Sequence, residues 1–286
     1  MAGGLRLKLC WAMAALWLVL TLWTAAAGPQ TSAASVAVLP SLLFMGLILI
    51  HGSLSYGWKG IGLYFAIGVL AGFVLEASSI ATGFPFGLYK HNVPGPRLLD
   101  VPIPTILAYA VLGAPSWMLA RLIVRRDPSR SQGSDIWTTP IIGAFIMTGM
   151  DFAFDPIGHT VRHQWTFAHP SGQFGVPLSN FLGWLLIGWI IFQLFALVER
   201  RFTATAAVRN GGYWLLPCIL WLGSAIQFPF LFAQAPAGIT RVGDRAFVIA
   251  DVYEAGLIAA IMTVIFTGLL GLMRLVSDPP RSWPSP

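Results

Sequence analysis

Carboxylates recur in this sequence close to the ends of apolar stretches. Glu76 lies inside one such stretch, shortly before "GFPFGLYKHN" at 83–92. Asp151 and Asp155 end another stretch in "MDFAFDPIGH", and Asp251 and Glu254 begin the last one in "ADVYEAG". Spacings of four and three residues put the members of each pair on one helical face. Two carboxyl groups in unlike surroundings can act as acid and base, so acid–base chemistry is the first hypothesis.

The composition indicates which elements carry these acids. Of 286 residues, 56% are hydrophobic and 10% are charged, whereas about 25% of the residues of a soluble domain are charged. Apolar stretches of about 20 residues, the length of a membrane-spanning helix, recur along the chain. The sequence therefore predicts an all-α fold, a polytopic integral membrane helical bundle of about eight transmembrane helices, or about seven if the first is a cleaved signal. The predicted spans are 7–27, 36–56, 60–80, 102–124, 137–154, 176–198, 213–233 and 247–274.

A single membrane domain is expected over residues 1–286, because no linker, low-complexity segment or internal repeat divides the chain. It comprises an N-terminal signal-anchor-like helix at 1–35, a core helical bundle at 36–274 and a cytoplasmic tail at 275–286. The first span also fits a signal peptide, since "LRLK" precedes the apolar stretch and "AAAG" follows it. We favour a retained helix.

Basic residues predict the orientation of the spans. With the N-terminus inside, 12 lysines and arginines fall on the cytoplasmic side and 5 on the other, as the positive-inside rule requires. We expect a multi-pass protein of the cell membrane with cytoplasmic N- and C-termini. "VRRDPSR" (124–130) and "ERRF" (199–202) are then ordinary cytoplasmic loops. The acids named above lie near the outer ends of their helices, and because a charge within a span costs about 2.5–3.5 kcal/mol, such acids usually face an interior cavity.

Two long outward loops follow the acids. The loops at 83–101 and 156–177 are rich in glycine, proline and aromatic residues. Pro156 is expected to end the helix that carries Asp151 and Asp155. Polar backbone at membrane depth must be covered by protein, so we expect the two loops to pack against each other as a lid over the acids.

Metal binding is an alternative role for the second loop. "HTVRH" places His159 and His163 four residues apart, just after "DFAFD", and imidazole and carboxylate groups suit several transition metals. The sequence lacks an HExxH pattern and the histidine boxes of membrane di-iron oxygenases. Interfacial histidines are therefore the favoured interpretation, and no metal site is predicted. Cys10 and Cys218 show no metal-type spacing and are expected to be packing residues.

Several short motifs in succession resemble those of a known family. "GFPFGLYKH" after an intramembrane glutamate is followed by "DVPIP", "DFAFDP", a tryptophan-containing loop and "FGVPLSNFLGW", over roughly residues 40–275. This order resembles the membrane carotenoid-biosynthesis family that includes bisanhydrobacterioruberin hydratase and the carotenoid end-group hydratases. The resemblance implies addition of water across a terminal C=C bond of an acyclic or monocyclic carotenoid, giving a tertiary alcohol. "YKHN" and "HTVRHQW" depart from the family pattern and leave the exact substrate open.

The residues can support such a hydration. A carboxylic acid must protonate the alkene, for which Glu76 and Asp151 are the leading candidates, and a second group must accept a proton from the attacking water. Carboxylates and aromatic faces would stabilise the carbocation. No organic cofactor or metal is needed for this reaction. The predicted catalytic residues are Glu76, Asp151, Asp155 and Glu254, and the predicted substrate-binding residues are Tyr89, Trp165, Asn180, Trp184 and Asp251.

The expected partners are a carotenoid, membrane lipids and other carotenoid-biosynthesis enzymes. No basic stripe with interleaved aromatic residues points to nucleic acid. A carotenoid or terpenoid cyclase or isomerase would use the same acid chemistry, and a non-catalytic subunit of a carotenoid-assembly complex would tolerate loss of the acids. A transporter would favour paired interrupted helices in two repeats, and the sequence has no such repeat.

Overall fold

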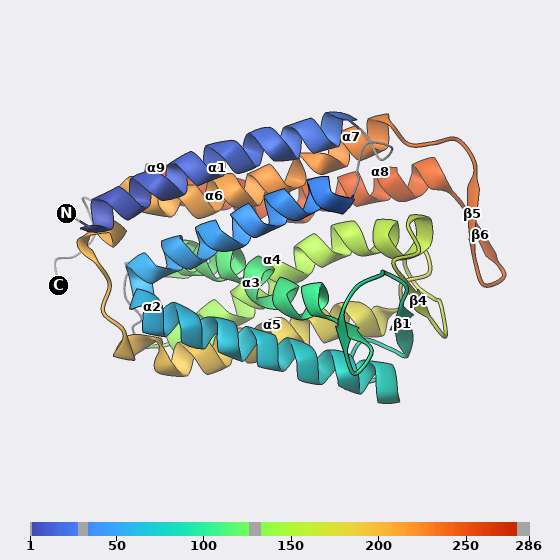
Figure 1. The fold of residues 1–286 in the computed structure, drawn as a ribbon, viewed down its shortest axis with the longest axis horizontal. Coiled ribbons are helices and arrows are strands. Elements are labelled where there is room, and N and C mark those ends of the chain that lie inside the picture. The colour runs from blue at the N-terminus through green and yellow to red at the C-terminus, as the bar shows by residue number, and fades with distance from the viewer. Residues whose placement is uncertain (1, 28–33, 126–132, 279–286) are drawn as a thin grey trace.

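The chain forms a bundle of long helices that run roughly along one common axis (Figure 1). The structure, a computed structural model, describes residues 2–27, 34–125 and 133–278. Most of the predicted loop at 124–130 and residues 279–286 of the predicted tail lie outside the described residues. The α-helices are α1 (Ala2–Ala27), α2 (Ala34–Thr82), α3 (Ile103–Val124), α4 (Asp135–Pro156), α5 (Leu178–Val198), α6 (Gly211–Ala225), α7 (Gln227–Ala233), α8 (Ile249–Ala260) and α9 (Phe266–Ser277). Short helical turns are η1 (Ile157–Val161), η2 (Glu199–Arg201), η3 (Ala206–Arg209) and η4 (Ile261–Ile265).

The predicted polytopic helical bundle is confirmed. In the described chain, 7 helical segments are long and apolar enough to cross a membrane. The predicted spans 36–56 and 60–80 both lie in α2, which bends at Gly57, where φ is 63° and ψ is 175°. Glycine adopts this conformation at little steric cost because it lacks a Cβ atom. The two arms of α2 run in opposite directions on either side of the bend, so this one segment supplies two passes (Figure 1).

Small residues bring the central helices close together. A Cβ atom on Gly68 of α2 would lie 2.8 Å from the Cβ of Ala110 on α3. A Cβ atom on Gly188 of α5 would lie 3.1 Å from the Cα of Ala144 on α4. In membrane proteins, small residues at helix contacts allow such close approach and increase van der Waals packing. This packing draws together the helices that carry Glu76, the two aspartates of α4 and the polar start of α5.

Short strands cover one end of the bundle (Figure 1). Strands β1 and β4 pair antiparallel, with Tyr89 opposite Phe167 and His91 opposite Trp165. This ribbon joins the two outward loops, and it confirms the prediction that they pack against each other. The strands are β1 (Tyr89–His91), β2 (Arg97–Leu98), β3 (Val101–Pro102), β4 (Trp165–Phe167), β5 (Ile239–Val242) and β6 (Arg245–Val248).

The prediction that Pro156 ends its helix is wrong. Helix α4 includes Pro156 and continues directly into η1, a π-helical turn. Proline removes one helix hydrogen bond, but contacts from other segments hold this turn. The Oγ1 of Thr240 donates to the carbonyl oxygen of Thr160 at 2.7 Å, and the Trp165 ring packs so closely on Gly158 that a Cβ there would come within 2.3 Å. These tertiary contacts compensate for the missing hydrogen bond.

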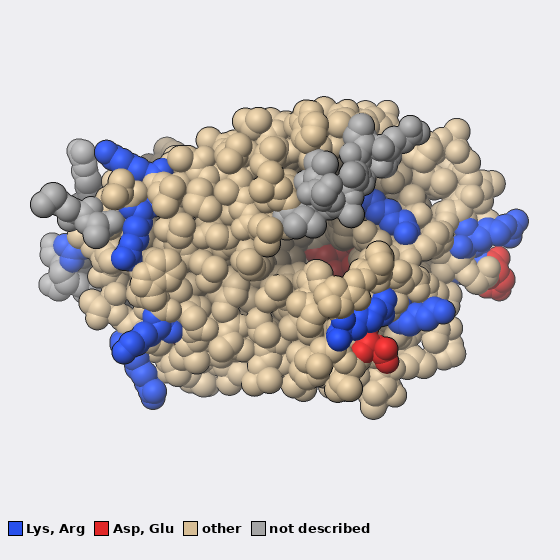
Figure 2. Space-filling model, viewed as in Figure 1, with Lys and Arg blue, Asp and Glu red and all other residues tan. Residues whose placement is uncertain are grey.

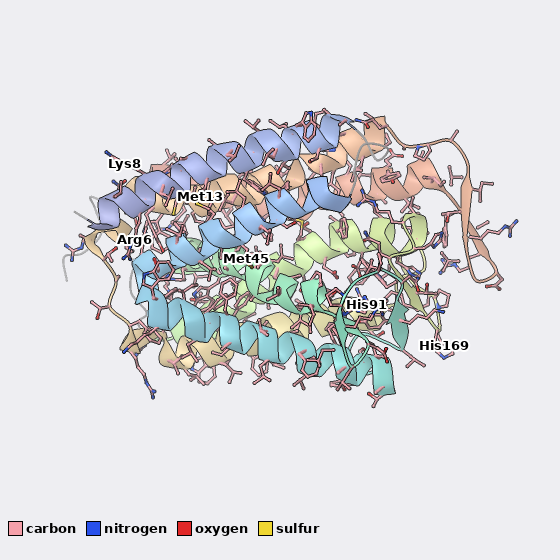
Figure 3. All side chains as sticks on the ribbon, in the orientation of Figure 1. Arg6, Lys8, Met13, Met45, His91 and His169 are labelled. Atoms are coloured by element: carbon pink, nitrogen blue, oxygen red, sulfur yellow. The ribbon has the colours of Figure 1, made fainter. Side chains whose placement is uncertain are left out.

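Charged side chains on the face in Figure 2 lie mainly toward the two ends of the bundle, and an uncharged band separates them. Such a distribution suits a protein whose middle is surrounded by lipid. Helix α1 begins and α9 ends at the same end of the bundle (Figure 1). Arg6 and Lys8 lie at that end, and His91 and His169 lie at the other (Figure 3). The chain is therefore a multi-pass membrane protein.

Candidate active site

Glu76 is buried near the C-terminal end of α2, where three side chains form hydrogen bonds with it. Its side chain is 4% exposed. The Tyr109 hydroxyl, from α3, donates to Oε1. The Tyr89 hydroxyl donates to Oε2, and the His91 Nε2 lies 3.1 Å from the same oxygen. These three partners hold the Glu76 carboxyl group in one orientation.

The geometry of β1 explains how one short strand supplies two of these donors. Alternate residues of a strand point to the same face, so Tyr89 and His91 both face Glu76 while Lys90 between them is exposed. Burial raises the pKa of the Tyr89 phenol well above its ordinary value, and the neighbouring charge of Glu76 adds to this rise. The phenol therefore stays protonated and remains a hydrogen-bond donor.

A second buried cluster lies on the facing helices α4 and α5. Asp151 and Asp155 are each 4% exposed, and the Nδ2 of Asn180 donates to both of them, at 3.2 Å to the Oδ2 of Asp151. Both carboxyl groups therefore converge on one amide nitrogen. Two carboxylates that share a site repel each other, so the arrangement favours a state in which one of the two carries a proton. Such a pair is suited to act as an acid.

Aromatic rings join the two clusters. Trp184 lies four residues after Asn180, on the same face of α5, and its ring centroid is 4.8 Å from that of Tyr109 and 6.5 Å from that of Phe86. Gly183 makes room for Phe86, because a Cβ there would come within 2.4 Å of the ring. The carboxyl groups and the rings therefore belong to one site.

A hollow opens on the long side of the bundle, and acidic atoms are visible in its floor (Figure 2). The hollow lies beside the charged side chains of one end of the molecule, where it borders the uncharged band. Among the described residues, the acids buried at this end of the bundle are Glu76, Asp151 and Asp155.

Three predicted site residues lie apart from these contacts. Trp165 packs against Gly158, and its ring centroid is 6.4 Å from that of Phe154. Asp251 and Glu254 are exposed in the first turns of α8. The structure thus brings together six of the predicted residues: Glu76, Tyr89, Asp151, Asp155, Asn180 and Trp184.

The two histidines considered as metal ligands, His159 and His163, contact other polar groups. The Nδ1 of His159 lies 3.0 Å from the carbonyl oxygen of Trp165, and the Nε2 of His163 lies 3.4 Å from the Oγ1 of Thr240. Because a carbonyl oxygen only accepts, the Nδ1 of His159 carries the hydrogen. Within the described ranges, no group of three or more His, Cys, Asp or Glu side chains converges as metal ligands would.

The opposite end of the bundle contains a buried ion pair that sequence reasoning missed. The Nη2 of Arg125 lies 2.5 Å from the Oε1 of Glu199, and the two side chains are 1% and 4% exposed. The Nε of Arg125 donates to the Oγ1 of Thr139 at 3.2 Å. The interpretation of both segments as ordinary cytoplasmic loops is wrong for these two residues, because their charges fold inward and compensate each other.

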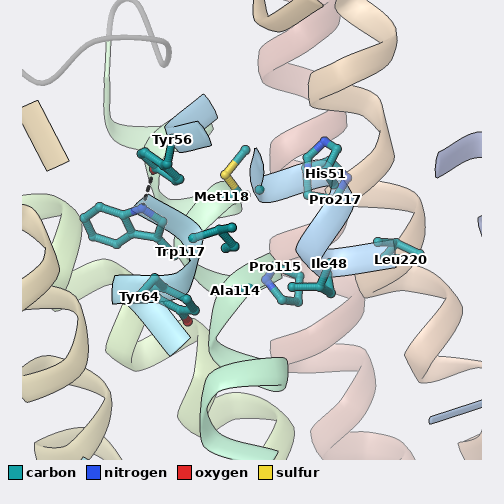
Figure 4. Close-up of a pocket in the computed structure, with 12 residues that line it drawn as sticks. Ile48, His51, Tyr56, Tyr64, Ala114, Pro115, Trp117, Met118, Pro217 and Leu220 are labelled. Atoms are coloured by element: carbon teal, nitrogen blue, oxygen red, sulfur yellow. Dashed lines mark hydrogen bonds between the residues drawn. The ribbon is translucent and has the colours of Figure 1, made fainter. Parts of the chain in front are cut away.

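A small cavity lies near this ion pair, between α2, α3 and α6 (Figure 4). Its lining includes Tyr64, Trp117 and His51, and the Nε1 of Trp117 donates to the Tyr56 hydroxyl at 2.8 Å. The cavity volume is about 20 Å³, which is enough for a water molecule but not for an isoprenoid end group. The Nε2 of His51 lies 3.0 Å from the carbonyl oxygen of Tyr213.

Two residues of the acid site, His91 and Tyr109, were not predicted from the sequence. Each contacts Glu76 directly. The alternation of Tyr89 and His91 would have indicated a shared face if residues 89–91 had been interpreted as a strand. Tyr109 is the single tyrosine of the apolar stretch 103–124. Its partner lies 33 positions away in the chain, so local sequence patterns do not indicate the contact.

Comparison with known proteins places this chain in a family. The family model described as "Carotenoid biosynthesis protein" matches residues 34–239, more than half of the chain. The bisanhydrobacterioruberin hydratase of Haloarcula japonica is 27% identical over 160 residues, which cover 55% of this chain and 52% of that protein. The chain thus matches about half the length of this relative. No solved structure matches this chain. The protein belongs to the carotenoid biosynthesis protein family, and its role is carotenoid-related.

Proposed function

We propose that this protein is a carotenoid hydratase, which adds water across a terminal C=C bond of an acyclic or monocyclic carotenoid and forms a tertiary alcohol. One observation carries the proposal: two buried carboxyl groups that converge on one amide nitrogen lie in the same aromatic-lined site as a third carboxyl group with three polar partners. Family membership supplies the substrate class, and the similar archaeal protein is a hydratase by name.

In the first step, the Asp151–Asp155 pair donates its proton to the less substituted carbon of the terminal double bond. The alkene π electrons form the new C–H bond, and the positive charge remains on the tertiary carbon. The pair, which held one proton and one negative charge, is left as two carboxylates, and the Nδ2 of Asn180 donates to both of them. The rings of Trp184 and Tyr109 offer π faces to the cation.

In the second step, a water molecule attacks the tertiary carbon through an oxygen lone pair, and Glu76 takes the proton that this water loses. Tyr89, Tyr109 and His91 keep Glu76 ready as an acceptor. The proton then returns from Glu76 to the aspartate pair, so that the enzyme is restored. The net change is one water added to one alkene, with no oxidation or reduction.

The hollow in the side of the bundle supports a lipophilic substrate. A carotenoid dissolved in the bilayer would reach the acids laterally, without crossing the aqueous interface. Membrane lipids would compete for the same opening, and enzymes that make or consume the carotenoid would be natural neighbours in the membrane.

The test is co-expression with a pathway that makes an acyclic carotenoid, followed by mass analysis of the pigments. A product heavier by one or two water molecules, with a tertiary hydroxyl, would support hydration. An isomer of unchanged mass would instead identify a cyclase or isomerase. Unchanged pigment in cells that accumulate the protein, across acyclic and monocyclic substrates, would contradict both.

We further propose that the protein lies in the cell membrane with both termini in the cytoplasm. The asymmetry of 12 basic residues against 5 supports this orientation. Cysteines introduced at position 130 and at position 165 should then react with a membrane-impermeant reagent from opposite sides. Labelling of position 130 from outside intact cells would show that the orientation is opposite to the one proposed.

A further inference from the structure

His91 was not among the residues that the sequence indicated, yet its side chain is 5% exposed and directed at Glu76. A carboxylate offers about four lone-pair sites for hydrogen bonds. Tyr89 and His91 occupy Oε2, and Tyr109 occupies one site on Oε1. With the donors that the described residues supply, a single acceptor site remains, and it is on Oε1.

We infer that His91 is a positioning residue: by filling the second site on Oε2, it directs the base function of Glu76 to Oε1, where the attacking water must bind. This inference rests on the proposed hydration. Since the Glu76 carboxylate only accepts, the Nε2 of His91 carries the hydrogen of this bond. Without that donor, water could bind at either oxygen of Glu76, and at Oε2 it would be misplaced for attack.

The position of His91 does not depend on its own side chain. Arg97 donates from Nη1 and from Nη2 to the backbone carbonyl oxygen of His91, each at 3.2 Å, and from Nη2 to that of Val93 at 2.6 Å. Pairing with β4 holds the same strand from its other side. Substitution of the imidazole should therefore change the hydrogen bond to Glu76 while the strand stays in place.

The kinetic test compares His91→Leu with His91→Gln, with Lys90→Gln as the matched control on the exposed face of β1. Misplacement of a reacting group by about 1 Å can cost on the order of 100-fold. We therefore expect kcat for hydration to fall about 10- to 100-fold in His91→Leu with little change in KM. The amide N–H of His91→Gln can replace the donor, so this variant should recover most of the activity.

Equal loss in His91→Leu and His91→Gln would overturn the inference, because the ring and not the donor would then matter. Full activity of His91→Leu would overturn it as well. Both outcomes require a wild-type protein that hydrates a carotenoid, so they differ from a failure of the proposed function.

A second measurement needs no activity. A hydrophobic carbodiimide modifies protonated carboxyl groups in membranes, and mass spectrometry can quantify the modification of Glu76. Hydrogen bonds to a charged group stabilise the charged form, so His91→Leu should increase the labelling rate of Glu76 about tenfold or more, and His91→Gln much less. Identical labelling in all variants would show that His91 does not act on Glu76, whether or not the protein is a hydratase.

Discussion

Replacement of Asp151 by asparagine tests the source of the proton. Asp151 is 4% exposed, accepts a hydrogen bond from the Nδ2 of Asn180, and shares that donor with Asp155. An asparagine keeps the shape of the side chain: its carbonyl can accept from Asn180, and its amide can donate to Asp155. Its N–H protons are not acidic, and Asp155 then remains alone as a carboxylate. We expect the fold to tolerate the change, because no buried polar group loses its partner.

The expected loss of activity follows from the role of the proton. General acid catalysis contributes about 10²–10⁴-fold, which corresponds to about 2.7–5.4 kcal/mol of activation free energy at about 1.36 kcal/mol for each factor of ten. Hydrated pigment should therefore fall to about 1% of the wild-type amount or less. The assay measures the initial rate of product formation in membranes, normalised to the amount of inserted protein.

Asp244→Asn is the matched control, since it makes the same chemical change at an exposed residue between β5 and β6. It should retain activity within about twofold, as surface substitutions usually do. Wild-type-like hydration by Asp151→Asn, with normal protein levels, would refute the assignment of the acid to this pair. Glu76 would then be the acid to test next.

Three further predictions address other parts of the molecule. Lys90→Cys with Thr166→Cys should form a disulfide, because these residues face each other in the β1–β4 ribbon and paired strand positions lie within disulfide reach; absence of the crosslink under oxidation would count against the ribbon. Arg125→Ala should destabilise the protein by about 3–5 kcal/mol, because it leaves the buried charge of Glu199 without its opposite charge. The loss should appear as a lower unfolding temperature in detergent, and the double variant Arg125→Met with Glu199→Leu should recover part of the lost stability. Glu254→Gln should change the hydration rate by no more than about twofold, because the side chain is exposed. A loss of more than about tenfold would show that Glu254 takes part in catalysis.

Much of the acid site could be predicted from the sequence, because placing a carboxyl group in an apolar span costs free energy and such residues are therefore conspicuous. Asp151 and Asp155 stand out in an apolar span, and their spacing of four places them on one helical face, as the structure confirms. Asn180 and Trp184 were also found, and they share a face of α5 for the same reason. The prediction that Pro156 ends its helix was wrong. The helix-breaking tendency of proline is a local property, and it does not take account of the contacts that Thr240 and Trp165 make with the following turn.

The sequence by itself determined that this is a helical membrane protein, since the length and apolarity of each stretch are local properties that lipid solvation acts on directly. It also determined which acids are unusual, namely those that lie within or next to the apolar stretches. Only the tertiary structure decided which partners they have. Tyr109 meets Glu76 across 33 positions of the chain, and Arg125 meets Glu199 across 74. Such pairs form because a buried charge must find hydrogen bonds or an opposite charge wherever the packing of helices provides them, and that packing has no counterpart in the local pattern of residues.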